Sequence, residues 1–85
     1  MAYVISEHRK SDFEADEFFV HHVLYLNAGD AGRAAKLALG AATRDAIEGE
    51  LVDDPGDVEF DLSEWDNVKV DGCGWSATVE VWEVA

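Results

Sequence analysis

The alanine-rich stretch over residues 30–44 constrains the fold most, because its apolar side chains recur with the period of a helix. In a helix over this range, alanines and leucines cover most of the surface and leave one polar arc. That arc holds Arg33, Lys36, Gly40, Thr43 and Arg44. The remaining arc is wide and made mostly of small residues, so the sequence predicts a helix whose axis can lie close to a sheet.

The two ends of this helix are marked by residues that favour starting and stopping. Asp30 follows the turn-forming residues 27–29, and its short side chain can accept the free amides of a first helical turn. Asp30 is therefore the predicted N-cap. Asp45 would project from the apolar arc, so we expect the helix to fray or bend after Arg44 and to stop at Gly49.

Two segments before the helix have strand patterns. Residues 2–8 alternate weakly and predict a short first strand, and the polar residues 9–17 predict a loop. Residues 18–27 have the strongest strand pattern, with apolar side chains at both even and odd positions. A strand that is apolar on both sides is typically covered on both sides, so this segment is the expected central strand.

After the helix the chain alternates again. Residues 57–63 place apolar side chains on one side and acids and a serine on the other, the pattern of a strand with one buried face. Residues 68–70 and 75–84 predict a hairpin, because the glycines within 71–74 can supply a tight turn. The buried side of the last strand is expected to consist of Trp75, Ala77, Val79 and Val81.

Together these segments predict a single α+β domain over residues 1–85, with elements in the order ββαβββ. The sheet is expected to be mainly antiparallel, with about four to five strands, and the amphipathic helix to cover one face of it. The other face would then be open to solvent. Alternation along the strands assigns three acids and a tryptophan to this face: Glu59, Asp61, Glu80 and Trp82.

The formal charge of −13 is concentrated in the second half of the chain. Residues 1–44 contain six acids and five bases, a net charge of −1, whereas residues 45–85 contain thirteen acids and one base, Lys69, a net charge of −12. Adaptation to high salt would distribute acids over both halves. The asymmetry instead favours a surface that attracts a cationic partner, since such a field accelerates capture of that partner.

Patterns typical of catalysis, metal binding or cofactor binding are missing from the sequence. His21 and His22 are neighbours on an expected strand and so point to opposite faces, which prevents them from sharing an ion. Cys73 lies between two glycines without a group that would activate its thiol. The acids over residues 53–61 lack the ligand spacing of a calcium loop. We expect a protein that is not an enzyme and has neither a metal site nor a cofactor.

Direct binding of nucleic acid is not expected either, because the basic groups that could form a stripe are few. They are Arg33, Lys36 and Arg44 on the helix, against a net charge of −13. The sequence contains neither a signal peptide nor an apolar run long enough to cross a bilayer. A cytoplasmic protein without a membrane partner is therefore expected.

The acids of residues 53–66 suggest what kind of partner would fit. Alternate residues of a strand lie about 6.6 Å apart, roughly two phosphate steps along one strand of a nucleic-acid duplex. Asp57, Glu59 and Asp61 would form such a row, and four further acids flank it: Asp53, Asp54, Glu64 and Asp66. Glu80 and Trp82 would add a charge and an aromatic anchor of the kind found at interfaces. The row suits a basic groove that normally holds nucleic acid.

With these features the chain resembles the small acidic proteins of bacteriophages and mobile elements, and is similar to anti-CRISPR proteins in particular. The resemblance rests on the short length, an early strand pair, the alanine-rich helix that begins at Asp30, and an acidic, strand-rich remainder. It implies an inhibitor that acts in the host-cell cytoplasm. Its acids would occupy the surface of a CRISPR surveillance complex or nuclease that otherwise holds target DNA or guide RNA.

A structural role is the alternative. The open sheet face or an edge strand could form a homodimer, and the charge could then serve solubility or salt adaptation. The sequence leaves this alternative open beside the inhibitor hypothesis.

Overall fold

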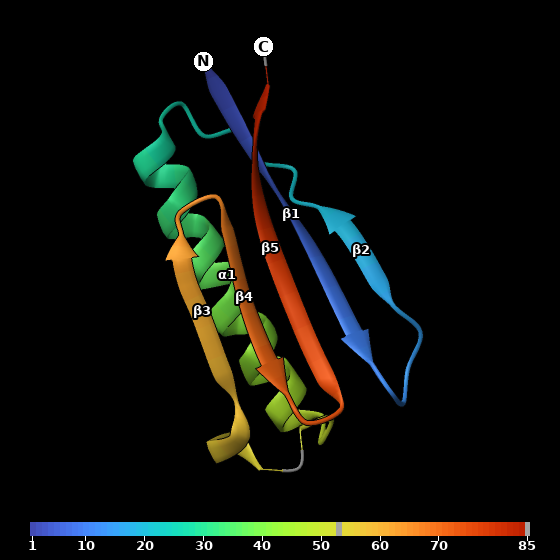
Figure 1. Cartoon of the computed structure of the whole chain (residues 1–85). Helices are drawn as coiled ribbons and strands as arrows, with labels where there is room; N and C mark the ends of the chain where they lie inside the picture. The colour runs from blue at the N-terminus through green and yellow to red at the C-terminus, as the bar shows by residue number, and fades with distance from the viewer. Residues whose placement is uncertain (53, 85) are drawn as a thin grey trace.

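Two long strands, β1 (Ala2–Ser11) and β5 (Trp75–Val84), lie side by side at the centre of an antiparallel sheet. The computed structural model describes residues 1–52 and 54–84. The strand order is β2-β1-β5-β4-β3, with every neighbouring pair antiparallel (Figure 1). The remaining elements are β2 (Glu17–Val20), α1 (Ala28–Glu48), the short 3-10 helix η1 (Pro55–Asp57), β3 (Glu59–Glu64) and β4 (Asn67–Gly72).

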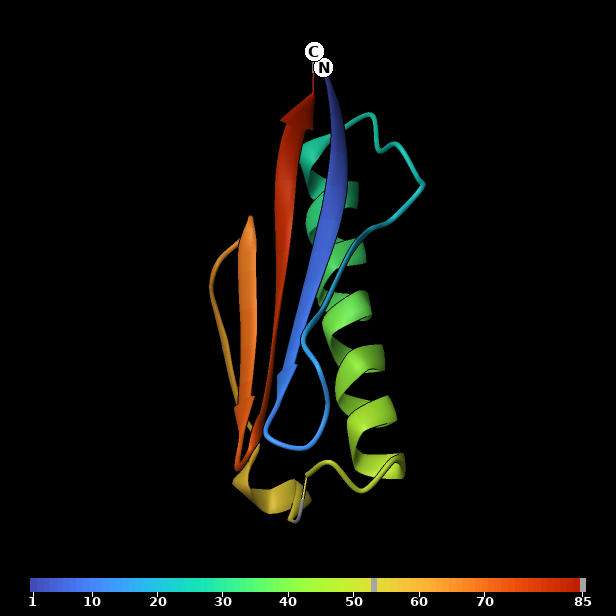
Figure 2. The same ribbon diagram turned by 90° about the vertical axis from the view of Figure 1, so that its right-hand side faces the viewer.

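The molecule has two layers, a sheet and one helix, which confirms the predicted α+β fold with a helix on one face. Figure 2 shows α1 running along one side of the sheet, and none of the described elements covers the other side. Figure 1 looks onto that uncovered side, with the strands in front of the helix. No helix among residues 1–52 and 54–84 is long and apolar enough to cross a bilayer.

The core lies between α1 and strands β1, β4 and β5. The predicted buried set of β5 is confirmed, since Trp75, Ala77 and Val79 are buried and Val81 is half-buried. Opposite them the helix places Leu39 and small residues, among them Ala35 and Ala42. Burying a leucine contributes about 1.5–3 kcal/mol, and the alanines let the helix approach the sheet closely.

The predicted start of the helix is wrong, whereas its predicted stop at Gly49 is confirmed, although the helix does not end or fray after Arg44. The N-cap is Asn27, whose Oδ1 accepts the backbone N–H of Asp30 at 2.8 Å, so the N-cap lies three residues before the predicted one and the helix begins at Ala28. At the other end the helix continues through Asp45 to Glu48. Asp45 is tolerated because its side chain is exposed and its carboxylate lies 3.7 Å from the guanidinium of Arg9 on β1.

Two side chains of α1 also lie on the side opposite to the predicted one. Thr43 was assigned to the polar arc but is buried, because its hydroxyl donates to the carbonyl of Leu39 at 2.8 Å and needs no water. Leu37 belonged to the apolar arc but is 75% exposed. The apolar arc is wider than the sheet can cover.

The prediction of a central strand over residues 18–27 is wrong. The strand β2 is only four residues long, pairs with β1 alone, and forms one edge of the sheet. The chain leaves the sheet after Val20 and crosses to the start of α1, touching β1 again where Tyr25 pairs with Tyr3. The centre of the sheet is formed by β1 and β5, and β1 extends to Ser11 rather than ending at His8.

At the opposite edge, β3 starts two residues later than predicted. Pro55 begins the short helix η1, and Asp54 caps it by accepting the Gly56 N–H at 2.9 Å. Asp57 is the last residue of η1 and therefore precedes the strand. The predicted row of Asp57, Glu59 and Asp61 on one strand is thus wrong for Asp57 and right for the other two.

Candidate protein-binding face

The uncovered side of the sheet, called here the open face, carries two adjoining groups of side chains. Over β3, β4 and β5 it presents five acids, which we call the acidic patch: Glu59, Asp61, Glu64, Asp71 and Glu80. Four of them are exposed and Glu80 is half-buried. Lys69 is the one base that β3, β4 and β5 contain, and it lies within the patch.

The strand register sets the order of charges within the patch. Residues that are paired across an antiparallel ladder point to the same side, so Glu59 stands directly opposite Asp71 and Asp61 directly opposite Lys69. Two acids in register repel each other, whereas Asp61 and Lys69 attract. The patch therefore contains one favourable and one unfavourable charge pair, and its net charge remains strongly negative.

Asp61 is held in its ionised form by hydrogen bonds from Ser63, first from its hydroxyl and then from its backbone N–H. The N–H and hydroxyl of Ser63 both donate to Asp61 Oδ1, at 3.1 and 2.7 Å, where the register of β3 shifts between Asp61 and Glu64. These hydrogen bonds, and more weakly the charge of Lys69, lower the pKa of Asp61 below its ordinary value of 3.8. The carboxylate is thus a fixed, charged acceptor at neutral pH.

Beside the acidic patch lies an apolar patch, which consists of Val4, Phe18, Val20 and Trp82. Trp82 is 51% exposed, yet its indole N–H donates to the hydroxyl of Ser6 at 2.8 Å, which fixes the ring on the sheet. The register continues the patch across β1 to β2, because Val4 pairs with Trp82 and Ser6 pairs with Val20. An aromatic held in place beside charged groups is the composition of an interface anchor.

The structure brings together only some of the residues that the sequence predicted to bind a partner. Glu59, Asp61, Glu64 and Glu80 lie in the acidic patch, and Trp82 lies beside it. Asp57 belongs to η1 and Asp54 caps it, and Asp66 lies in the turn between β3 and β4, where its carbonyl accepts the Val81 N–H at 2.8 Å. Asp53 is outside the described residues.

Sequence reasoning missed Asp71 as a member of the patch. The sequence predicts a turn over residues 71–74, which includes Asp71. In the structure the turn is shorter than expected, and Asp71 is part of β4 and pairs with Ser76. The turn consists of two residues, Cys73 and Gly74, and Gly74 has a φ of 78°. A glycine at the second position of a two-residue turn is the sequence signal that could have placed Asp71 on the strand. Cys73 itself is exposed, in agreement with its predicted place in a turn.

The bases of the helix do not neutralise the acidic patch. The guanidinium of Arg33 pairs with Asp30 at 2.6 Å, within the helix. Over residues 1–52 and 54–84, the ion pairs within 4.0 Å join residues of β1 and α1 and the two residues that flank β2, Asp16 and His21, and they involve no acid of the patch. The field of the patch is therefore directed to solvent.

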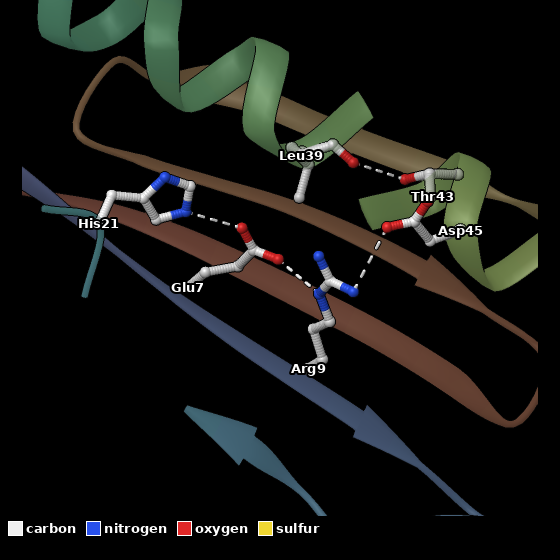
Figure 3. Close-up of polar contacts among 6 residues, drawn as sticks. All are labelled: Glu7, Arg9, His21, Leu39, Thr43 and Asp45. Atoms are coloured by element: carbon white, nitrogen blue, oxygen red, sulfur yellow. Dashed lines mark hydrogen bonds and ion pairs between the residues drawn. The ribbon is translucent and has the colours of Figure 1, made fainter. Parts of the chain in front are cut away.

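A second charged cluster lies on the helix side of the sheet, and Figure 3 shows it. Glu7 of β1 is only 2% exposed, and its carboxylate accepts Arg9 Nε at one oxygen and meets His21 Nε2 at 3.0 Å at the other. Arg9 reaches on to Asp45 at 3.7 Å and lies 5.5 Å from the centre of the Phe19 ring. Both partners of Glu7 are partly exposed, so the cluster ties β1 to the segment after β2 and to α1.

The hollow nearest this cluster is small and contains no histidine. It measures about 220 Å³ and lies between the β1–β2 loop and the second half of α1, lined among others by Arg9, Glu17, Asp45 and Trp75. Neither His8 nor His22 lines it. Among the residues described, no group of three or more His, Cys, Asp or Glu side chains is arranged to hold a metal ion.

Comparison with protein-family models, with curated proteins and with solved structures gives no match. The open face is therefore interpreted from its own chemistry.

Proposed function

We propose that the protein is an inhibitor of the anti-CRISPR kind, which binds a basic nucleic-acid-binding surface of a CRISPR effector complex through its open face. The observation that supports this most is the acidic patch, in which five acids surround a single lysine on an uncovered sheet. Cationic grooves that hold nucleic acid are selected to bind closely spaced anions, and the patch offers them in a fixed arrangement.

The spacing of the acids supports the proposal. Glu59 and Asp61 are two positions apart along β3, about 6.6 Å, and Asp71 lies across from Glu59 on the next strand, about 5 Å away. Anions at such short separations present a basic groove with a dense row of negative charge, as a phosphate backbone does. The hydrogen bonds from Ser63 hold the carboxylate of Asp61 in place before a partner arrives.

The adjoining Trp82 supplies what charge alone does not. Surface charges mainly raise the rate of association and choose between partners, whereas buried aromatic anchors lower the rate of dissociation. Trp82 is half exposed and fixed by Ser6, so a partner can cover it at little cost in side-chain entropy. Binding is thus expected to begin at the acids and to be completed at the tryptophan.

The test is competition between the protein and labelled target DNA for a purified CRISPR effector complex. The parent should displace the DNA, and the triple variant Glu59→Gln, Asp61→Asn, Glu80→Gln should not. The matched control is Glu14→Gln, Glu48→Gln, Glu50→Gln, which changes the net charge equally at exposed positions outside the patch. If the two variants compete with the DNA to the same degree as each other, the acids of the patch have no special role in binding, and the proposal is wrong.

A further inference from the structure

The two edges of the sheet differ in how they are protected from other strands. The edge strand β3 carries acids at Glu59, Asp61 and Glu64 and has a register shift, both of which discourage pairing with another strand. The edge strand β2 has an uninterrupted register and the sequence Glu-Phe-Phe-Val. Figure 1 shows β2 at the margin of the sheet, with no described element beyond it.

The segment that starts in β2 is exposed, apolar and free of formal charge. Phe18 is 67% exposed and Val20 44%, and the following chain exposes Val23 and Leu24 as well. Residues 18–29 contain no Asp, Glu, Lys or Arg, in a chain where such residues make up 29%. On a molecule with a charge of −13, this segment therefore presents no formally charged Asp or Glu side chain of its own to repel a second copy.

The outer backbone groups of β2 are available for pairing. The N–H of His21 donates to the carbonyl of Ile5 at 2.9 Å, and hydrogen-bonded pairs alternate along an antiparallel ladder. Glu17 and Phe19 therefore direct their backbone groups toward β1, and Phe18 and Val20 direct theirs away from the sheet. An added strand would bond to Phe18 and Val20.

The sequence around Phe19 is complementary to itself when two copies run antiparallel. If Phe19 lies on the two-fold axis, Phe18 pairs with Val20 of the second copy, and each exchanges its N–H and C=O with the other. The same register places Glu17 opposite His21 and Asp16 opposite His22 of the second copy. Acids precede the apolar centre and histidines follow it, so neither end meets a like charge.

We propose that two copies of this chain associate through β2 and form one continuous antiparallel sheet across a two-fold axis. The open faces of the two copies then lie on the same side, with the apolar patches adjacent at the centre and an acidic patch toward each end. This proposal does not rest on the proposed function, because the acidic patch lies at the opposite edge of the sheet.

Sedimentation equilibrium over a range of protein concentrations, in low and in high salt, tests the proposal. The parent should form dimers that persist in high salt, because the contact is made by backbone and apolar groups. Val20→Pro removes an outward N–H without removing a bond to β1, so the fold should be kept. Since each dimer loses two hydrogen bonds, its dissociation constant should rise roughly a hundredfold. The control Leu37→Lys, on the outer side of α1, should dimerise like the parent.

Hydrogen exchange in the parent provides a test that needs no variant. The amides of Phe18 and Val20 should become protected as the concentration rises, while the amide of Lys69 on β4 should not change. A parent that stays monomeric at every concentration overturns the proposal. Dimers that Val20→Pro leaves unweakened, or dimers in which the Phe18 and Val20 amides exchange freely, overturn it as well.

Discussion

Glu59 and Asp71 stand directly opposite each other on neighbouring strands, so the sheet holds two carboxylates in register on its open face. Two residue pairs further along, and on the same face, Asp61 stands opposite Lys69. Like charges directly opposite destabilise a sheet and opposite charges stabilise it. The arrangement costs stability for the isolated protein, and a cationic partner would relieve that cost.

Charge reversal at these two positions should have opposite effects on stability. Glu59→Lys creates a favourable pair with Asp71 and should raise the free energy of unfolding by about 0.2–1 kcal/mol. Asp61→Lys places two lysines opposite each other and should lower it, although the net charge changes equally. Urea denaturation at low ionic strength measures both. If both variants gain stability alike, overall repulsion and not the register controls the effect.

The pKa of Asp61 should depend more on Ser63 than on Lys69. Ser63→Ala removes the side-chain hydrogen bond that is the largest cause of the lowered pKa, so it should raise that pKa toward 3.8 by more than Lys69→Met does. Because folding lowers this pKa, the ionised group adds stability above about pH 3.8, and this contribution is lost as the pH falls through the lowered value. Carboxyl NMR titration of the parent and the two variants measures the pKa of Asp61 in each. A larger rise of this pKa in Lys69→Met than in Ser63→Ala would contradict the prediction.

The arginine at Glu7 should matter far more for stability than an arginine on the helix surface. Arg9→Met leaves the buried carboxylate of Glu7 with His21 alone, and removing one partner of a buried pair costs about 3–5 kcal/mol. Arg33→Met breaks an exposed pair with Asp30 and should leave stability nearly unchanged. Thermal and urea unfolding compare the two. Equal losses would show that Glu7 is reached by water when Arg9 is removed.

Periodicity predicted the fold well wherever one face of an element is buried and the other is wet. Trp75, Ala77 and Val79 are buried as expected, and Glu59, Asp61, Glu80 and Trp82 lie on the open face. In β5 burial decides which way a side chain points, whereas β3 is exposed along its whole length and the buried face predicted for it is wrong, since Phe60 and Leu62 are exposed. The sequence therefore predicted most of the acidic patch without any knowledge of the strand order.

The same reasoning was wrong where apolar residues are not buried. Phe18 and Val20 suggested a central strand, but they are exposed on an edge, because a hydrophobic pattern does not distinguish a core from a contact surface. Asp57 was misplaced because Pro55 and the capping side chain of Asp54 form a helical turn first. The cluster at Glu7 could not be predicted, because it joins residues that are distant in sequence.

The central claim, that the acidic patch is the surface that receives a basic partner, is tested most directly by titrating the isotope-labelled protein with an oligo-arginine peptide and following its amide resonances. The account predicts that the largest shifts fall on Glu59, Asp61, Asp71 and Glu80 and extend to the indole of Trp82. Equal shifts at Glu14, Glu48 and Glu50 would contradict it, since they would show that the peptide responds to overall charge rather than to this face.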